Sequence, residues 1–216
     1  MSGTLQVGGI TLGTHNSGTG KVDLTNQGTL TLNTNTTFPA GHVLQVFQTF
    51  KNDDDSIAGV AESSATGKNS FAFIPGQGSD AVFQKGITVT GSNKVLITHH
   101  GCYSSNQALY KILICLFRGS AVDTAIGSCT KLGAGEVGPS GNQSQSILSL
   151  TMDSASTETH ASFSFLDSPG AGTHYYKLGW LGEVNGTYYI NRNHNDGNVA
   201  YHSRTSSTLN VMEIKA

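Results

Sequence analysis

Short runs of alternating apolar and polar residues, separated by glycine, asparagine, aspartate or proline, dominate the C-terminal quarter of the chain. They occupy residues 163–170, 175–180, 187–192 and 206–216. Short runs rich in aromatic and β-branched side chains, bounded by turn residues, are typical of strands. The pattern predicts an all-β fold, either a sandwich or a barrel.

The closing run is apolar on both faces. Side chains alternate across a strand, so Leu209 and Val211 face one side and Met212 and Ile214 face the other. A strand with one solvated face alternates apolar with polar residues instead. We therefore expect cover on both sides of this strand, from the sandwich core on one side and from a second subunit on the other.

Two further runs share this two-sided apolar character, Val43–Phe50 and Ala108–Phe117. Burial on both faces fits strands of a sandwich that also oligomerises. The run His160–Leu166 instead alternates cleanly, with Ala161, Phe163 and Phe165 facing inward. No stretch shows helical periodicity with caps, and about eight to ten strands is the range of a jelly roll. The other expected strands are residues 69–74, 86–90, 94–101 and 147–152, and residues 119–130 are expected to be a strand with its turn. Residues 51–68 are expected to form a polar loop.

The order of the C-terminal motifs carries a family resemblance. Phe-Leu-Asp-Ser-Pro at 165–169, Lys-Leu at 177–178, Tyr-Ile-Asn-Arg at 189–192 and Ser-Thr-Leu-Asn-Val-Met-Glu-Ile at 207–214 resemble the C-terminal domain of tail-fibre-like and other virion structural proteins of marine bacteriophages. The resemblance covers residues 41–216, and its motifs are structural. It implies a jelly-roll-like β-sandwich that forms a homotrimer and belongs to the virion, after assembly in the host cytoplasm.

Residues 1–40 differ from the rest of the chain. They repeat two apolar residues at period two followed by turn formers, and no aromatic residue occurs before Phe38. Such pieces cannot bury a core alone. Two interpretations stay open: an extended β arm or short shaft in which three copies wind together, or a tail that orders on binding another virion protein. In both, residues 1–40 attach the protein to the virion and residues 41–216 form the sandwich domain.

Composition narrows the function classes. Charged residues are 12% of the chain, the net charge is −2, and lysine and arginine do not cluster, so nucleic acid is not an expected partner. A hydrophobic content of 37% argues against a disordered chain. No apolar run approaches the length of a membrane span, so we expect no membrane insertion.

Cysteine and histidine patterns predict neither a metal nor a cofactor. Cys102, Cys115 and Cys129 are widely spaced and are expected to be buried free thiols. His99 and His100 point to opposite faces of one strand. The loop that holds His194, Asp196 and His202 matches neither a zinc motif nor an EF-hand, so its asparagines and aspartates are interpreted as turn formers.

Catalytic signatures are also absent from the sequence, and we expect no enzyme. There is no Gly-x-Ser-x-Gly motif. Glycoside hydrolysis needs two facing carboxylates, and four glutamates lie in or near expected loops. A glycan-degrading virion enzyme therefore stays the second alternative. The four glutamates are Glu62, Glu136, Glu158 and Glu183.

Carbohydrate contact is the expected chemistry. Tyr188 and Tyr189 follow a Val-Asn-Gly turn and alternate faces, so one of them should face outward, whereas Tyr176 and Trp180 should lie in the core. The outward tyrosine either contacts a sugar or packs on a neighbouring subunit. The leading hypothesis is a tail-fibre-like host-adhesion protein that binds a surface glycan, and the first alternative is a head fibre or capsid decoration protein. The expected glycan-binding residues are Tyr188, Tyr189, Asn191, Asn193, Asn195 and Asp196.

Overall fold

The computed structural model describes residues 4–7, 10–16, 21–24, 39–60, 70–78, 80–133, 145–153, 157–197, 200, 202 and 204–216. The chain divides into two compact units, residues 1–38 and 39–216. The first unit contains a three-stranded antiparallel sheet of short strands in the order β1–β2–β3. Its strands are β1 (Thr4–Val7), β2 (Ile10–Asn16) and β3 (Lys21–Leu24).

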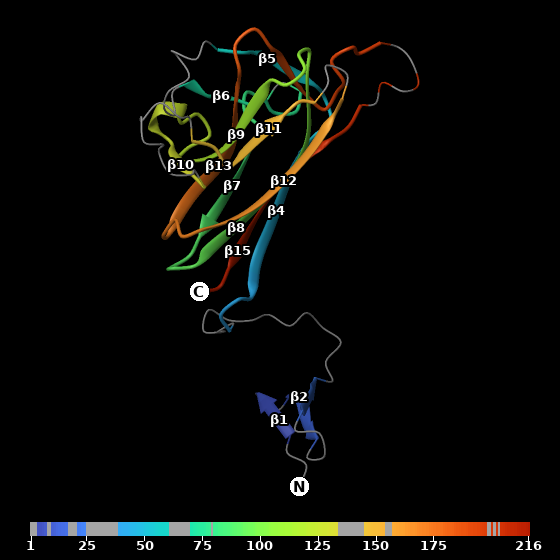
Figure 1. The fold of residues 1–216 in the computed structure, drawn as a ribbon. Coiled ribbons are helices and arrows are strands. Elements are labelled where there is room, and N and C mark those ends of the chain that lie inside the picture. The colour runs from blue at the N-terminus through green and yellow to red at the C-terminus, as the bar shows by residue number, and fades with distance from the viewer. Residues whose placement is uncertain are drawn as a thin grey trace. The chain divides into compact units, whose positions relative to one another are not determined.

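One sheet of the second unit, which we call sheet 1, is built around β8 (Figure 1). Both β15 and β12 pair with residues 95–100 of β8, so they lie on opposite sides of it, and β4 pairs with the free side of β15. The short strands β14 and β5 continue the sheet beyond the end of β15. The strands are β4 (Val43–Lys51), β5 (Asp55–Ala58), β8 (Lys94–Ser105), β12 (Thr159–Asp167), β14 (Thr187–Ile190) and β15 (Ser207–Ile214).

The other sheet, sheet 2, has β13 and β9 at its centre. The strands β7 and β6 follow each other along the free side of β13, and β10 and β11 follow each other along the free side of β9. The strands are β6 (Ala72–Phe73), β7 (Gln84–Val89), β9 (Lys111–Gly119), β10 (Thr130–Leu132), β11 (Leu148–Thr151) and β13 (Gly172–Gly182).

The winding of the strands is that of a jelly roll. Along the chain the main strands are β4, β7, β8, β9, β11, β12, β13 and β15. Sheet 1 takes the first, last, third and sixth of these strands, and sheet 2 takes the second, seventh, fourth and fifth. Eight antiparallel strands distributed in this way over two packed sheets form a jelly-roll sandwich. The all-β, jelly-roll-like prediction is confirmed, and the homotrimer stays a prediction.

The main core lies between the two sheets and follows the predicted alternation. Leu209 and Val211 are fully buried in it, whereas Met212 and Ile214 are half-buried on the opposite face of β15. Ala161, Phe163 and Phe165 of β12 also face the core, as expected from the sequence. The aromatic side chains of Tyr176 and Trp180 fill the space between the sheets.

The second apolar face of β9 is covered by the chain itself. Cys115 and Phe117 belong to a smaller buried cluster with Phe71, Cys129 and Leu181. The rings of Phe71 and Phe117 meet edge to face with centroids 5.8 Å apart. A second subunit is therefore not needed at this strand, and the expectation that its two-sided pattern signals oligomerisation is wrong for β9.

Two expected elements differ from the structure. Residues 119–130 were predicted to be a strand with its turn, but they form a turn and a 3-10 helix, Ile126–Ser128, before β10 begins. The Thr124 hydroxyl accepts a hydrogen bond from the Ala121 amide at 2.8 Å and contacts the Ala121 carbonyl at 3.0 Å, and such local bonds compete with strand pairing. In the expected polar loop 51–68, β5 is an additional strand. No helix among the described residues is long and apolar enough to cross a membrane.

Candidate functional site

An uncovered apolar row crosses the outer face of sheet 1, the face that points away from the core. Cross-strand pairing places one residue from each of four strands side by side. The two residues at the ends of the row, Val46 and Leu166, are 56% and 51% exposed. Cross-strand neighbours of this kind form one continuous surface. The apolar row consists of Val46, Met212, Leu96 and Leu166.

A polar row runs beside the apolar row and is satisfied within the chain. The Gln48 side-chain amide donates to Asn210 Oδ1 at 2.7 Å, and the Asn210 amide donates to Thr98 Oγ1 at 3.1 Å. This ladder links three strands of the outer face. The next row toward β14 contains Phe50, which is 54% exposed. The outer face therefore combines bonded polar groups with apolar groups that face solvent.

Farther along the same face, three side chains with metal-ligating atoms meet. Cys102 of β8 pairs with His160 of β12, and the Cys102 thiol lies 3.6 Å from Glu158 Oε2. The ligand atoms of the three residues lie within 4.8 Å of one another. Burial raises the pKa of the Cys102 thiol to about 11. Reasoning from sequence spacing missed this cluster because the residues are far apart along the chain and only the β8–β12 register unites them.

The three cysteines are buried and free, as predicted. His99 and His100 point to opposite faces of β8, also as predicted: His99 is buried and His100 is exposed. In the loop near His194, the Gly197 amide donates to His202 Nδ1 at 2.9 Å. The backbone amide of Asn195 donates a hydrogen bond to Asn193 Oδ1 at 3.0 Å, and such bonds are typical of turns.

Three residues of the expected glycan site, Tyr188, Asn191 and Asn193, are buried, which corrects the prediction for them. Tyr188 is fully buried, and its hydroxyl donates to the Glu183 carbonyl at 3.0 Å. A Cβ atom on Gly182 would lie 2.1 Å from the Tyr188 ring, so the glycine makes room for it. The Asn191 amide donates to the carbonyls of Lys51 and Asp53 at 2.8 and 2.9 Å. Neither side chain is accessible to a ligand.

The other expected glycan-binding residues lie in or beside an ion-pair network. The Arg192 guanidinium stacks 4.2 Å above the Tyr189 ring and forms ion pairs with Asp54 and Asp196, each at 2.9 Å. Arg204 pairs with the same two aspartates. Asn193 is buried, whereas Asn195 is exposed. The outward face of Tyr189 is thus occupied by an arginine of its own loop, which leaves this surface less suited to sugar stacking than the sequence predicted.

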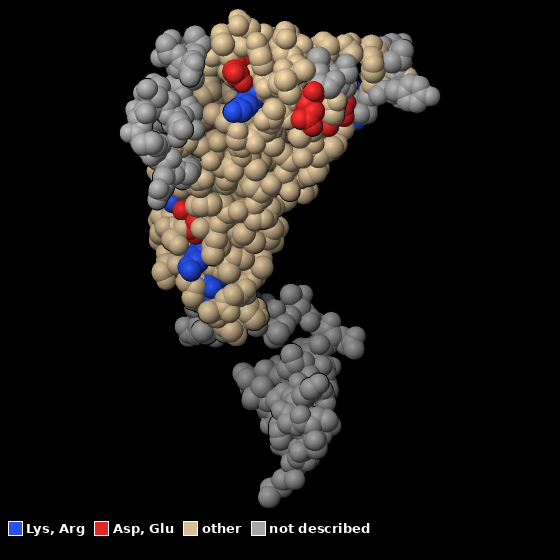
Figure 2. All heavy atoms as spheres, viewed as in Figure 1, with Lys and Arg blue, Asp and Glu red and all other residues tan. Residues whose placement is uncertain are grey.

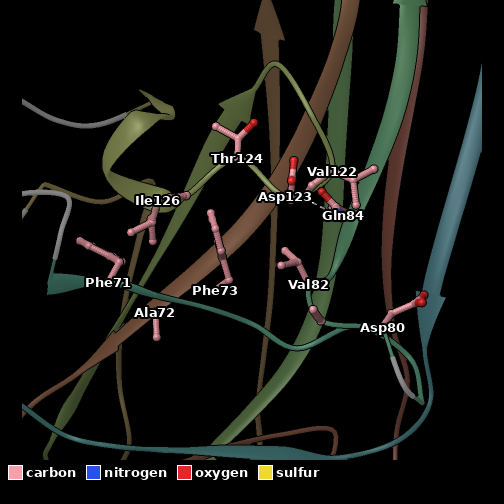
Figure 3. A pocket seen from close by; sticks show the side chains of 12 residues that line it. Phe71, Ala72, Phe73, Asp80, Val82, Gln84, Val122, Asp123, Thr124 and Ile126 are labelled. Atoms are coloured by element: carbon pink, nitrogen blue, oxygen red, sulfur yellow. Dashed lines mark hydrogen bonds between the residues drawn. The ribbon is translucent and has the colours of Figure 1, made fainter.

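A pocket of about 560 Å³ lies on the outside of sheet 2 (Figure 3). Its side chains come from the segment before β7 and from the turn before β10, with Phe73 between them. Lys177 holds the turn in place because its ammonium donates to the carbonyls of Val122 and Thr124 at 2.6 and 3.2 Å. Exposed Asp80 and Asp123 add carboxylates to the lining. The pocket combines an aromatic floor with polar groups.

Charge gives no sign of a polyanion partner. In the view of Figure 2, charged side chains form small groups of both signs, and most of the visible surface carries neither sign. Nucleic-acid binding needs a broad basic patch. The visible face has none among the described residues.

Comparison with known proteins gives a distant likeness among solved structures. No family model matches the sequence, and no curated protein matches it. Among solved structures, the chain is similar to one described as the structure of infectious bursal disease virus, Gx strain, with a TM-score of 0.42 and 10% sequence identity. The match covers 88% of this chain and 41% of the viral chain, so the chain spans less than half the length of that neighbour. The likeness concerns the fold alone, and the resemblance to phage virion proteins stays a prediction.

Proposed function

We propose that this chain is a structural protein of a bacteriophage virion and that it acts as a homotrimer assembled through the outer face of sheet 1. The jelly-roll winding and the C-terminal motifs support a virion role. Jelly rolls also occur in lectins and cupins, so the winding alone does not select this function.

The observation that carries the proposal is the apolar row. It runs across four strands, and Val46 and Leu166 at its ends are more than half exposed in the single chain. Fully burying one such side chain contributes about 1.5–3 kcal/mol. Exposed apolar side chains that form a continuous row across four strands support an interaction surface. A second copy of the chain is the partner that the two-sided closing strand and the family resemblance both imply.

Attachment to the particle is assigned to residues 1–40. The short strands β1, β2 and β3 belong to a unit separate from the jelly roll. Deletion of residues 1–37 is expected to leave a folded trimer that no longer enters virions. Incorporation is measured by producing the truncated and full chains during infection and purifying the particles. Normal incorporation of the truncated chain would contradict the virion-attachment role.

The place in the virion follows from copy number. A few trimers per particle indicate a tail fibre, whereas tens to hundreds of copies indicate a head fibre or capsid decoration protein. Quantitative mass spectrometry of purified virions, with the major capsid protein as the internal standard, measures this ratio. Absence of the chain from purified virions would overturn the proposed function.

Host adhesion is the second candidate, and the pocket on sheet 2 favours it. Aromatic rings stack on sugar faces and carboxylates bond sugar hydroxyls, and Phe73, Asp80 and Asp123 offer both. A glycan array with the trimer is expected to identify a ligand that Asp123→Ala weakens and that Asp153→Ala, at an exposed aspartate outside the pocket, leaves unchanged. If the array identifies no bound glycan, capsid decoration would remain as the proposed role.

A further inference from the structure

Three different ligand atoms converge where β12 begins. Cys102 and His160 are direct cross-strand partners, so their side chains lie on the same face of sheet 1. Glu158 precedes His160 by two residues and therefore shares that face. A sulfur, an oxygen and a nitrogen donor are thus brought together by strand register.

The separation of the sulfur and oxygen donors matches a tetrahedral metal site. Zinc binds cysteine sulfur at about 2.3 Å and carboxylate oxygen at about 2.1 Å, so the two atoms lie about 3.6 Å apart at a tetrahedral angle. The distance from Cys102 Sγ to Glu158 Oε2 is 3.6 Å. All three ligand atoms lie within 4.8 Å of one another.

The neighbouring groups support this site. The His100 ring stacks on the His160 ring with centroids 5.7 Å apart and planes at 15°, which holds the imidazole in place. The Thr205 hydroxyl lies beside the thiol, and its oxygen is buried without a hydrogen-bond partner of normal geometry. Cys102 itself is fully buried, whereas His160 is exposed. The site therefore has a protected sulfur and a side that is open to entry from solvent.

We propose that Cys102, Glu158 and His160 bind one zinc-class divalent transition-metal ion per chain. Thiolate and imidazole ligands suit zinc and cobalt better than calcium or magnesium. Binding releases the thiol proton to solvent, and the ion then links the start of β12 to β8. A fourth position stays available to water, so the site does not depend on the proposed trimer.

The test uses cobalt(II) as a spectroscopic probe of the untagged full chain. We expect a thiolate-to-cobalt absorption band that saturates at one ion per chain and disappears when zinc is added. Cys102→Ser should abolish this band, and Glu158→Gln and His160→Asn should each weaken binding by roughly tenfold or more. Circular dichroism of each variant confirms that it is folded.

Matched controls come from the other thiols. Cys115→Ser and Cys129→Ser also replace buried free cysteines, but neither belongs to the cluster, so both should keep the band. No saturable band in the folded wild-type chain, or a band that persists in folded Cys102→Ser, would overturn the proposal. Either result would reduce the cluster to a thiol–carboxylate hydrogen bond.

Discussion

The Nε2 atom of His99 lies 2.8 Å from the Tyr103 hydroxyl, across Gly101 on the buried face of β8. On the other side of the ring, Nδ1 lies 2.8 Å from the Thr208 carbonyl. A carbonyl only accepts, so Nδ1 carries the proton and Nε2 accepts from Tyr103. Burial lowers the pKa of His99 to about 4, so the imidazole is neutral at physiological pH.

Stability should therefore fall in mild acid. The pKa of His99 is about 4 in the folded chain and about 6.5 in the unfolded chain, so the unfolded state binds more protons below pH 6.5. The stabilisation is complete above that pH and is lost as the pH falls toward 4, by up to about 3 kcal/mol. Urea unfolding between pH 7.5 and 4 measures the loss.

His99→Gln removes the titrating group, and its stability should depend less on pH over this range. His174→Gln, at a histidine outside the core, should keep the wild-type dependence. If the free energy of unfolding changes equally with pH in wild type and in His99→Gln, the buried imidazole does not cause the acid sensitivity.

Removing the Tyr103 hydroxyl should also destabilise the jelly roll. Tyr103→Phe keeps the ring but leaves His99 Nε2 buried without a donor, at a cost of about 1–3 kcal/mol. Tyr175→Phe at a half-buried tyrosine of β13 is the control and should change stability little. Thermal unfolding of the two variants checks this, and equal midpoints would contradict the assigned hydrogen bond.

Glu213 should tie three segments together near the C-terminus. Its buried carboxylate accepts hydrogen bonds from the Thr90 amide at 2.8 Å, the Asn93 side chain at 2.8 Å and the Gln45 side chain at 2.6 Å. Burial alone would raise the pKa of Glu213, but these bonds outweigh it and lower the pKa. The stabilisation is present above the ordinary glutamate pKa and is lost as the pH falls through the lowered folded value.

Glu213→Gln should lower the free energy of unfolding by about 1.5–3 kcal/mol at pH 7. The charge-assisted hydrogen bonds are lost, and the amide hydrogens of the new glutamine point at groups that are themselves hydrogen-bond donors. Below pH 4 the difference from wild type should shrink. Urea titrations at both pH values measure it, and a constant difference would rule out the carboxylate charge as the cause.

Strand periodicity predicted the jelly roll because most strands have one face in a single core. The alternation of Ala161, Phe163 and Phe165 in β12 and of Leu209 and Val211 in β15 needs only the pleat of a strand. The second face of β9 could not be interpreted in the same way. Its cover comes from Phe71, which is distant in sequence, and from Cys129 after the turn that follows β9, and a partner subunit would produce the same pattern.

The candidate sites were less predictable because long-range register creates them. Which of Tyr188 and Tyr189 is the buried one depends on the packing around Gly182, and Cys102 meets His160 only through the β8–β12 pairing. The Arg192 side chain over Tyr189 likewise depends on a fold-dependent ion-pair network with Asp54. Residue type and spacing carried no signal for these contacts.

A charge on the apolar row should separate the proposed subunits. Leu166→Lys places an ammonium at one end of the row, where it would be desolvated in an interface. Val122→Lys is the matched control, since Val122 is also apolar and 54% exposed but lies at the pocket of sheet 2. Size-exclusion chromatography should show dissociation of Leu166→Lys alone; identical behaviour of both variants would place the interface elsewhere.

Multi-angle light scattering of the wild-type chain tests the central claim most directly. One chain has a mass of 22.6 kDa. The assembly through sheet 1 predicts a particle of three times that mass, stable on dilution, and a smaller particle for Leu166→Lys. A wild-type mass of 22.6 kDa at all concentrations would contradict the trimer.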